Sequence, residues 1–418
     1  MFKEIKRCLI CGNQKLVPLL DLGMQSLTGV FPKTKNMPVG QGPLCLIKCQ
    51  EDRDGKNCGL VQIGHIYNAK NLYGQTYGYR SGLNRSMVDH LHRKVKRILR
   101  RVTLNPNDVV IDVGSNDSTL LQGYPAKNLR LYGIDPLGDK MWKYYPPRIH
   151  LITGFFNKKI LEENIGSQKA KVITSIAMFY DLEFPLDFMQ QVYELLADDG
   201  VWVFEQSYMP TMLLMNSYDT VCHEHLEYYR LKQIKWMTDR VGFKIIDVEF
   251  NQINGGSFSV MVAKQNSSYR QATNLVSRIL KSEEKLGLHT LKPYRAFRQR
   301  VLQRKQELKL QISKLKKSGK KVLGYGASTK GNVILQYCKF GPKDISCIAE
   351  VNSEKFGAYT PGTLIPIVSE QEAKARKPDY FMVLPWHFKK SIILREKAFL
   401  KNGGKLLFPL PYPEIVKI

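Results

Sequence analysis

The stretch DVVIDVGSNDSTLL, Asp108–Leu121, combines an apolar strand, a glycine turn and the start of a helix. A second apolar segment, LRLYGIDP at Leu129–Pro136, ends in an acid about 20 residues after the glycine. In doubly wound folds such a turn lets a ligand approach the backbone, and the acid hydrogen-bonds ribose hydroxyls. The pair predicts a Rossmann-like site that contains Asp112, Gly114 and Asp135.

The elements that follow continue this pattern. Apolar strands are expected near residues 171–179 and 199–208, and PLDFMQQVYELLA between them is typical of a helix. Strand, helix and strand at this spacing indicate a parallel sheet. The helix-start glycines that a dinucleotide pyrophosphate needs are missing, and Asn116 and Asp117 stand there instead. We therefore expect S-adenosylmethionine as the ligand.

The cysteines cluster at the N-terminus, where five of the eight lie in the first 58 residues. In a large reduced protein this favours a metal over disulfides. CLICG, residues 8–12, is typical of one half of a zinc site, whereas the insertion QEDRDGKN separates the two cysteines of the other half, and Cys45 is a spare candidate. We expect one closed, structural zinc site, with free thiols as the alternative. Its expected ligands are Cys8, Cys11, Cys49 and Cys58.

Residues 72–91, LYGQTYGYRSGLNRSMVDHL, place several tyrosines ahead of an amphipathic helix that begins near Asn84. Tyr77 and Tyr79 either pack in the core or line a polar pocket beside Arg80.

A second strand, glycine loop and helix start follow at residues 320–337, KKVLGYGASTKGNVILQY. Its glycines and Lys330 would place free amides and a positive charge at a helix N-terminus, which is typical of an anion site, although the spacing is not that of a Walker loop. A long helix over about residues 290–317 would link this unit to the rest. Later strands indicate a second doubly wound domain, near residues 345–350, 379–388 and 403–411. A nucleotide fold kept only for packing is the alternative.

The segment DTVCHEHLEYY, residues 219–229, is dense in titratable groups. A zinc helix motif would need a histidine at Glu227, so that motif fails. His223 and His225 could share a face only on an extended segment, and no third metal ligand is evident. The alternatives are a polar strand end and a general base, in which a neutral imidazole takes a proton while Glu224 orients it or carries protons itself.

The composition narrows the class of protein. A chain of 418 residues predicts two to four domains, and 43% hydrophobic residues suffice for proper cores. No apolar run approaches the roughly 18 residues of a membrane span, and the N-terminal MFKEIKRCLICG does not resemble a signal peptide. We expect a cytoplasmic protein with no membrane partner. The net charge of +26 is spread along the chain and fits a basic proteome, a phosphate-bearing substrate or nucleic acid.

Taken in order, these motifs resemble one family, the zinc-containing sugar C-methyltransferases that act on nucleotide-linked 4-keto-6-deoxysugars. The resemblance covers nearly the whole chain, through CLICG, CGLVQ, YGYRSGLN, IDVGSND, GIDP, FYDLE, CHEHLEYY, NGGSF, GYGASTKGN, TPGT and PWHF. It implies an α/β fold with a small N-terminal zinc-binding domain, a Rossmann-like S-adenosylmethionine domain and a second Rossmann-like domain. We expect these at residues 1–83, 84–265 and 266–418.

The resemblance also implies an activity, the transfer of a methyl group to the 3′-carbon of a sugar carried as its deoxythymidine diphosphate ester. A base would form an enolate beside the 4-keto group. The catalytic residues implied are His225, Glu224 and Tyr79. The cofactor positions implied are Asp112, Gly114, Asn116 and Asp135, with Pro136 and Phe156 beside them. The expected substrate contacts are Tyr77, Arg80, Lys330 and Asn332.

The chain departs from the family pattern at one turn position, where S-N-D-G becomes S-N-D-S with Ser118. A side chain there is expected to crowd the turn beside the cofactor. Two other functions stay open. One is an RNA or protein methyltransferase that uses the zinc domain and basic surface for substrate binding. The other is a non-catalytic nucleotide-sugar binding protein. The favoured interpretation involves no nucleic acid and a monomer.

Overall fold

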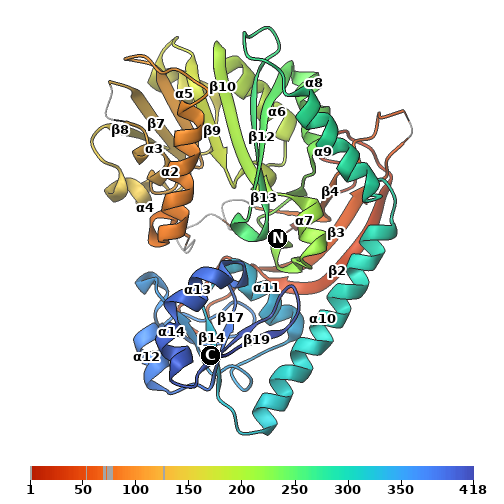
Figure 1. Cartoon of the computed structure of the whole chain (residues 1–418), viewed down its shortest axis with the longest axis vertical. Helices are drawn as coiled ribbons and strands as arrows, with labels where there is room; N and C mark the ends of the chain where they lie inside the picture. Colours follow the sequence, from red (N-terminus) through yellow and green to blue (C-terminus); the bar gives the residue numbers. More distant parts are fainter. Residues whose placement is uncertain (1, 53, 69–71, 73–78, 126–127) are drawn as a thin grey trace.

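The computed structural model describes residues 2–418 except 53, 69–71, 73–78 and 126–127. Two α/β units lie one above the other, and α10 (Lys292–Lys317) runs beside them along one side together with strands of the N-terminal sheet (Figure 1). In this part of the chain, no helix has the length and apolar character needed to cross a membrane.

The middle unit is a seven-stranded sheet in the order β12-β13-β10-β9-β6-β7-β8. Its strands are β6 (Val109–Val113), β7 (Arg130–Asp135), β8 (Ile149–Thr153), β9 (Ala170–Ile176), β10 (Leu196–Ser207), β12 (Phe243–Asn251) and β13 (Ser257–Lys264). β13 runs antiparallel to both neighbours, and the other pairings are parallel. Every residue of β6 is buried, which explains why the sequence shows an unbroken apolar run there.

The helices of this unit confirm the predicted alternation of strands and helices. They are α2 (Arg85–Leu99), α3 (Thr119–Gln122), α4 (Gly138–Met141), α5 (Lys158–Ile165), α6 (Pro185–Leu195), α7 (Met209–Leu214), α8 (Leu231–Val241) and α9 (Thr273–Lys285). α2 begins where expected, because the Asn84 side chain accepts a hydrogen bond from the Ser86 amide at 3.1 Å and so caps the first turn.

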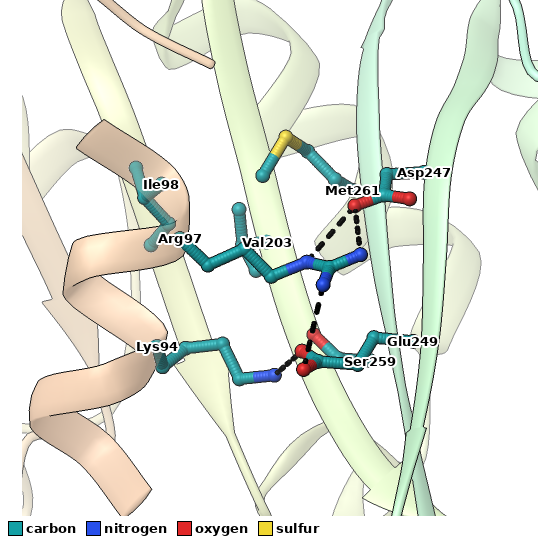
Figure 2. Close-up of a pocket in the computed structure, with 8 residues that line it drawn as sticks. All are labelled: Lys94, Arg97, Ile98, Val203, Asp247, Glu249, Ser259 and Met261. Atoms are coloured by element: carbon teal, nitrogen blue, oxygen red, sulfur yellow. Dashed lines mark hydrogen bonds and ion pairs between the residues drawn. The ribbon is translucent and has the colours of Figure 1, made fainter. Parts of the chain in front are cut away.

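Charged side chains fix α2 to the antiparallel edge of the sheet. Figure 2 shows Lys94 and Arg97 reaching from α2 toward Glu249 and Asp247 on β12, with ion pairs of 2.6 Å from Lys94 to Glu249 and 2.6 Å from Arg97 to Asp247. Lys94 also pairs with the buried Glu205 of β10 at 2.8 Å. Because each charge has a partner, α2 can dock without leaving an isolated buried ion.

The N-terminal sheet is antiparallel, in the order β11-β4-β3-β2. It comprises β2 (Leu16–Ser26), β3 (Gln41–Cys49), β4 (Val61–Ile63) and β11 (Glu227–Tyr228), while β1 (Phe2–Glu4) pairs with β5 (His65–Tyr67). β11 comes from the middle of the chain, directly after the histidine segment. This pairing, Glu227 with Gln62 and Tyr228 with Val61, was not expected from the sequence.

The C-terminal unit is the predicted second doubly wound domain, a six-stranded sheet in the order β16-β15-β14-β17-β18-β19. The strands are β14 (Val322–Tyr325), β15 (Ile348–Glu350), β16 (Ile367–Ser369), β17 (Tyr380–Val383), β18 (Lys405–Phe408) and β19 (Glu414–Val416). Its helices are α11 (Thr329–Cys338), α12 (Glu370–Ala375), α13 (Lys389–Arg395) and α14 (Lys397–Lys401). β17 ends earlier than predicted, because Pro385 and a 3₁₀ turn at Trp386–Phe388 follow it.

The long helix α10 buries one face, as predicted, and exposes the basic one. Its buried residues are Tyr294, Phe297, Val301, Leu308, Ile312 and Leu315. These side chains belong to a core cluster that also includes residues of the N-terminal sheet, α7 and the C-terminal sheet. α10 is therefore part of a shared core rather than a free linker.

Candidate active site

The four predicted zinc cysteines converge, although two come from CLICG and two flank a long insertion. The Sγ atoms of Cys8, Cys11, Cys49 and Cys58 all lie within 4.8 Å of one another. Cys8 to Cys58 is 3.4 Å and Cys11 to Cys49 is 3.6 Å. Four thiolates around zinc at 2.3 Å would stand about 3.8 Å apart, so the set fits one tetrahedral ion. Such a site is closed, and its role is structural.

The spare candidate Cys45 lies outside this group, with its Sγ 3.6 Å from His65 Nδ1. The insertion between the second pair of cysteines is folded back, since the Asn57 amide donates to the Asp52 carboxylate at 3.1 Å. The insertion thus lengthens a loop and still returns Cys58 to the metal cluster.

The cysteine cluster is tied directly to the histidine segment. β4 begins shortly after Cys58, and the Ile63 amide donates to the Leu226 carbonyl at 2.8 Å. On α8, the side-chain Nε2 of Gln233 donates to the Cys58 carbonyl at 2.7 Å. The metal-bearing loop therefore supports both sides of the turn that carries His225.

At the end of β6, the glycine turn has the geometry that the sequence predicted. Gly114 has φ +70, and Asn116 and Ser118 are also left-handed, at φ +50 and +60. The Asp135 carboxylate accepts hydrogen bonds from the Asn116 and Leu137 amides, each at 2.8 Å. Asp135 therefore ties two loops together in addition to its predicted role toward a ribose.

Burial sets the protonation of the acids here. It raises the pKa of Asp112 to about 7, with Asp135 nearby as a further cause, while a hydrogen bond of 2.6 Å from Thr174 Oγ1 partly opposes the shift. Burial also raises the pKa of Asp135, and its two amide donors oppose that shift.

Ser118 adopts a strained backbone conformation at this turn. It is fully buried in a left-handed conformation that favours glycine, and its Oγ donates to the Tyr144 carbonyl at 3.1 Å. The hydroxyl is thus directed at protein atoms. Pro136 and Phe156 follow β7 and β8 at the same sheet edge, and the Phe156 ring packs on Phe188 with centroids 4.5 Å apart.

The residues after the tyrosine loop dock on this turn. The amides of Ser81 and Gly82 donate to Asn116 Oδ1 at 3.0 Å and to Asp117 Oδ2 at 2.7 Å. Asn116 Nδ2 in turn donates to the Tyr79 carbonyl at 3.2 Å. Two segments predicted separately, one for substrate and one for cofactor, are therefore neighbours. Tyr77 lies outside the described residues.

Tyr79 and Arg80 line a pocket between the middle and C-terminal units. The Arg80 guanidinium lies 4.2 Å from the centroid of the Tyr144 ring. Across the pocket are residues 351–354 of the C-terminal unit, and Lys140 bridges the two sides through an ion pair of 2.9 Å with Glu354. These positions suit the predicted contacts with a substrate, a role that stays a prediction.

The histidine segment forms a buried turn before β11. It is not an extended strand end, and it does not form a metal cluster with other described residues. Among the described residues, only the four cysteines gather three or more metal-binding side chains. His225 is half-buried, and its Nδ1 lies 2.9 Å from the Thr220 carbonyl, so this nitrogen donates and Nε2 keeps the lone pair. Burial and the nearby Lys330 ammonium lower the pKa of His225 to about 3, which keeps the imidazole neutral.

Glu224 is more deeply placed than the sequence indicated. It is 5% exposed, and burial raises its pKa. Its Oε2 accepts from Thr28 Oγ1 at 3.3 Å, while Oε1 has no hydrogen-bond partner. Burial makes this carboxylate a stronger base than an exposed glutamate would be. His225 and Glu224 therefore differ more in their position than in their basicity.

The C-terminal glycine loop is built differently from the predicted anion cradle. A Cβ on Gly326 would lie 2.7 Å from Pro385, and one on Gly331 would lie 2.6 Å from Leu384, so both glycines permit close packing. The Gly331 amide is capped by Ser328 Oγ at 3.0 Å. The argument that these glycines expose free amides is therefore wrong.

Lys330 extends from this loop toward the histidine turn. Its Nζ lies 3.4 Å from the Asn254 carbonyl, and burial lowers its pKa, a shift opposed by nearby Asp219. Asn332 is fully buried, with its Nδ2 donating to the Thr28 carbonyl at 2.8 Å. Both predicted substrate residues thus lie where the three parts of the chain meet.

Buried polar atoms without hydrogen-bond partners concentrate at this junction. Those in the described residues include atoms of Ser217, Asp219, His223, Glu224, Glu227, Asn332 and His387. Because an orphaned buried polar atom is costly, such a concentration is typical of a site that receives a polar ligand. This is the observation that best locates the candidate active site.

Sequence reasoning missed several members of this site. Asp219 is fully buried, its pKa is raised to about 6 by burial, and its Oδ2 accepts from Trp386 Nε1 at 2.8 Å. Lys330 helps to lower the pKa of His387, which burial already depresses. Asp219 opens the quoted histidine segment, and Trp386 and His387 lie in PWHF, so the motifs were visible but their convergence was not.

Comparison with known proteins gives three family matches along the chain. A zinc binding domain matches residues 8–73, a methyltransferase domain matches 85–248, and a C-methyltransferase C-terminal domain matches 252–411. The C-methyltransferase NovU of Streptomyces niveus is 27% identical over 418 residues, which is 99% of this chain and 97% of that protein.

Solved structures match the chain at lower similarity. The CcbJ methyltransferase from Streptomyces caelestis is 13% identical, with 42% of this chain and 89% of that chain covered and a TM-score of 0.33. An S-adenosylmethionine-dependent methyltransferase from Archaeoglobus fulgidus is 10% identical, with 42% and 94% covered and a TM-score of 0.34. The three domain matches and the full-length relative, together with the cysteine cluster, indicate that the chain is an S-adenosylmethionine-dependent C-methyltransferase with a zinc-binding domain.

Proposed function

We propose that the enzyme transfers a methyl group from S-adenosylmethionine to the 3′-carbon of a nucleotide-linked 4-keto-6-deoxysugar, carried as its deoxythymidine diphosphate ester. The concentration of orphaned polar atoms around His225 carries this proposal, because a densely polar ligand would satisfy them. The sugar resemblance of the sequence motifs and the similarity to a C-methyltransferase support it. A cytoplasmic monomer without a nucleic-acid partner stays our prediction from the sequence.

His225 is proposed to remove the 3′-proton. The carbonyl of Thr220 holds its Nδ1 proton, so the neutral ring presents Nε2 as an acceptor. Its side chain is half-buried, whereas Glu224 is 5% exposed and already bonded to Thr28. Access to the substrate therefore favours His225, with Glu224 as a neighbour that stabilises charge.

Exchange of the 3′-proton with deuterated water tests this assignment, with unreactive S-adenosylhomocysteine in the cofactor site. His225→Asn should slow exchange by about 10²–10⁴-fold, the usual contribution of positioned acid–base catalysis. The exposed His289 provides a control, His289→Asn, which should exchange like the wild type. If Glu224→Gln abolishes exchange while His225→Asn retains it, the carboxylate is the base.

A thermal-shift screen separates the other functions. Stabilisation by both S-adenosylhomocysteine and thymidine diphosphate is expected. Stabilisation by RNA with no response to thymidine diphosphate would instead favour an RNA methyltransferase. A response to the nucleotide alone would indicate a non-catalytic sugar-nucleotide binding protein.

A further inference from the structure

We propose that Lys330 acts at the reaction centre, where it stabilises the enolate oxygen, and not as an anchor for the diphosphate. This inference rests on the proposed function. It assigns a C-terminal side chain to chemistry that starts at His225 in the middle of the chain.

The Lys330 ammonium group lies close to several side chains of the candidate active site. Lys330 is close enough to His225 and His387 to lower the pKa of each, and close enough to Asp219 for each to oppose the pKa shift that burial causes in the other. These groups belong to the histidine turn and to the loop after β17. Lys330 therefore lies among the residues of the candidate active site and not at its rim.

The hydrogen-bond partner of Lys330 is neutral, so its ammonium group can interact with a negative charge that develops on the substrate. Its Nζ forms a long hydrogen bond of 3.4 Å to the Asn254 carbonyl. No carboxylate of the described residues forms an ion pair with it, and Asp219 directs Oδ2 to the Trp386 indole. A half-buried cation in this condition interacts strongly with a nearby developing anion.

The loop around Lys330 does not suit a diphosphate. The Ala327 amide donates to Glu350 Oε2 at 2.7 Å, so a carboxylate already occupies part of the supposed cradle. The Gly331 amide is bonded to Ser328. A diphosphate would meet negative charge and satisfied amides there.

The chemistry then balances with the residues present. His225 Nε2 takes the 3′-proton, the C–H electron pair becomes the 3′,4′ double bond, and the 4′-oxygen gains the negative charge that Lys330 stabilises. In the next step the enolate re-forms the 4′-carbonyl while the 3′-carbon bonds to the methyl carbon. The bond from methyl to sulfur breaks, and its electron pair stays on the sulfur of S-adenosylhomocysteine.

Kinetics of Lys330→Met separate the two roles. An enolate-stabilising lysine predicts that kcat and the rate of 3′-proton exchange fall by about 10²–10³-fold, while KM for the sugar nucleotide changes little. Lys330→Arg should recover part of the exchange rate because it keeps the charge. Lys305→Met, which removes a half-buried lysine from the face of Tyr337, is the matched control and should behave like the wild type.

A second measurement needs no substrate. Histidine NMR on the ligand-free enzyme should show the pKa of His225 rising in Lys330→Met, since one of the two causes of its depression is removed. This readout also shows that the variant has folded.

Three outcomes decide the matter. Raised KM with normal exchange at saturating substrate would restore the diphosphate role and overturn the inference. If the wild type exchanges the 3′-proton and Lys330→Met exchanges it equally fast, the role of Lys330 is overturned, while the proposed substrate stands. Failure of the wild type to exchange the 3′-proton would overturn the proposed substrate as well.

Discussion

The two glycine loops of this chain look alike in sequence and differ in what their residues do. Both follow a buried strand, both have a left-handed glycine, and in both an acid at the end of the next strand accepts a loop amide: Asp135 at 2.8 Å in the middle unit and Glu350 at 2.7 Å in the C-terminal unit. At Gly114 a Cβ would meet only the Met178 side chain, at 3.1 Å, whereas at Gly326 it would meet the ring of Pro385 at 2.7 Å.

The difference shows that a glycine turn followed by an acid predicts a backbone conformation but does not by itself identify a ligand. In the middle unit the turn accepts hydrogen bonds from the amides of Ser81 and Gly82, and we predict that it binds the cofactor. In the C-terminal unit the same shape brings the loop and the start of α11 against Leu384 and Pro385, which follow β17, and directs Lys330 toward Asn254. Four experiments test this difference between the two loops.

The largest contrast is expected between Gly326→Ala and Gly114→Ala. Gly326→Ala combines a left-handed backbone with overpacking against Pro385 and should lower the free energy of unfolding by about 2–4 kcal/mol. Gly114→Ala should cost about 1–2 kcal/mol, because Met178 can move, yet it alone should abolish binding of S-adenosylhomocysteine. Urea unfolding and calorimetry are the measurements. Loss of cofactor binding in Gly326→Ala would contradict the division of roles.

A second contrast is in pH dependence. Asp112 lies two residues before Gly114, and the corresponding residue before Gly326 is the uncharged Gly324. Burial raises the pKa of Asp112 from 3.8 to about 7, so its contribution to stability is full at low pH and is lost as pH rises toward 7. Between pH 5 and pH 8 the wild type should therefore lose about 2–3 kcal/mol more than Asp112→Asn. Parallel unfolding curves for the two proteins would refute this.

The two carboxylates provide the third test. Asp135→Asn leaves one acceptor oxygen for two amides and the ribose, so binding of S-adenosylhomocysteine should weaken by roughly 1.5–3 kcal/mol. Glu350→Gln should leave that affinity unchanged. Titration calorimetry measures both affinities. A similar loss of affinity in both variants would contradict the assignment of the cofactor to the Gly114 loop.

The smallest effect concerns the serine at the start of each helix. Ser328 is an ordinary N-cap that accepts from the Gly331 amide, so Ser328→Ala should cost about 1 kcal/mol. Ser118 sits at φ +60 without capping its helix, so Ser118→Gly should relieve strain while losing the hydrogen bond to Tyr144, for a net change within about 1 kcal/mol. Affinity for S-adenosylhomocysteine should not fall in Ser118→Gly, and a tenfold fall would show that the hydroxyl helps to hold the cofactor.

Local pattern predicted the parts of this molecule that depend on nearby residues. The strand ending at Val113, the capped start of α2 and the apolar face of α10 follow from period and capping, and they are confirmed. The convergence of the cysteines also followed from the sequence, because five of the eight cysteines cluster in the first 58 residues.

The sequence could not predict how deeply individual side chains are buried or which distant segments are in contact. The depth of Glu224, and the contact of Asp219 with Trp386, depend on segments far apart in the chain. The glycines near Lys330 were expected to expose amides, but close packing against Leu384 and Pro385 requires glycine for another reason. Spacing alone cannot distinguish these two uses.

The pairing of β11 with β4 has a consequence for how the chain is made. Glu227 and Tyr228 complete a sheet whose other strands lie within residues 16–63, so during synthesis the four cysteines can come together long before β11 is available. The metal would then hold a preformed edge, and the histidine turn takes its final shape only when β11 adds to that edge. A nascent chain that has loaded its metal would thus be folded at one end and still inactive, because Lys330 and Asn332, which meet the histidine turn, are made after β11.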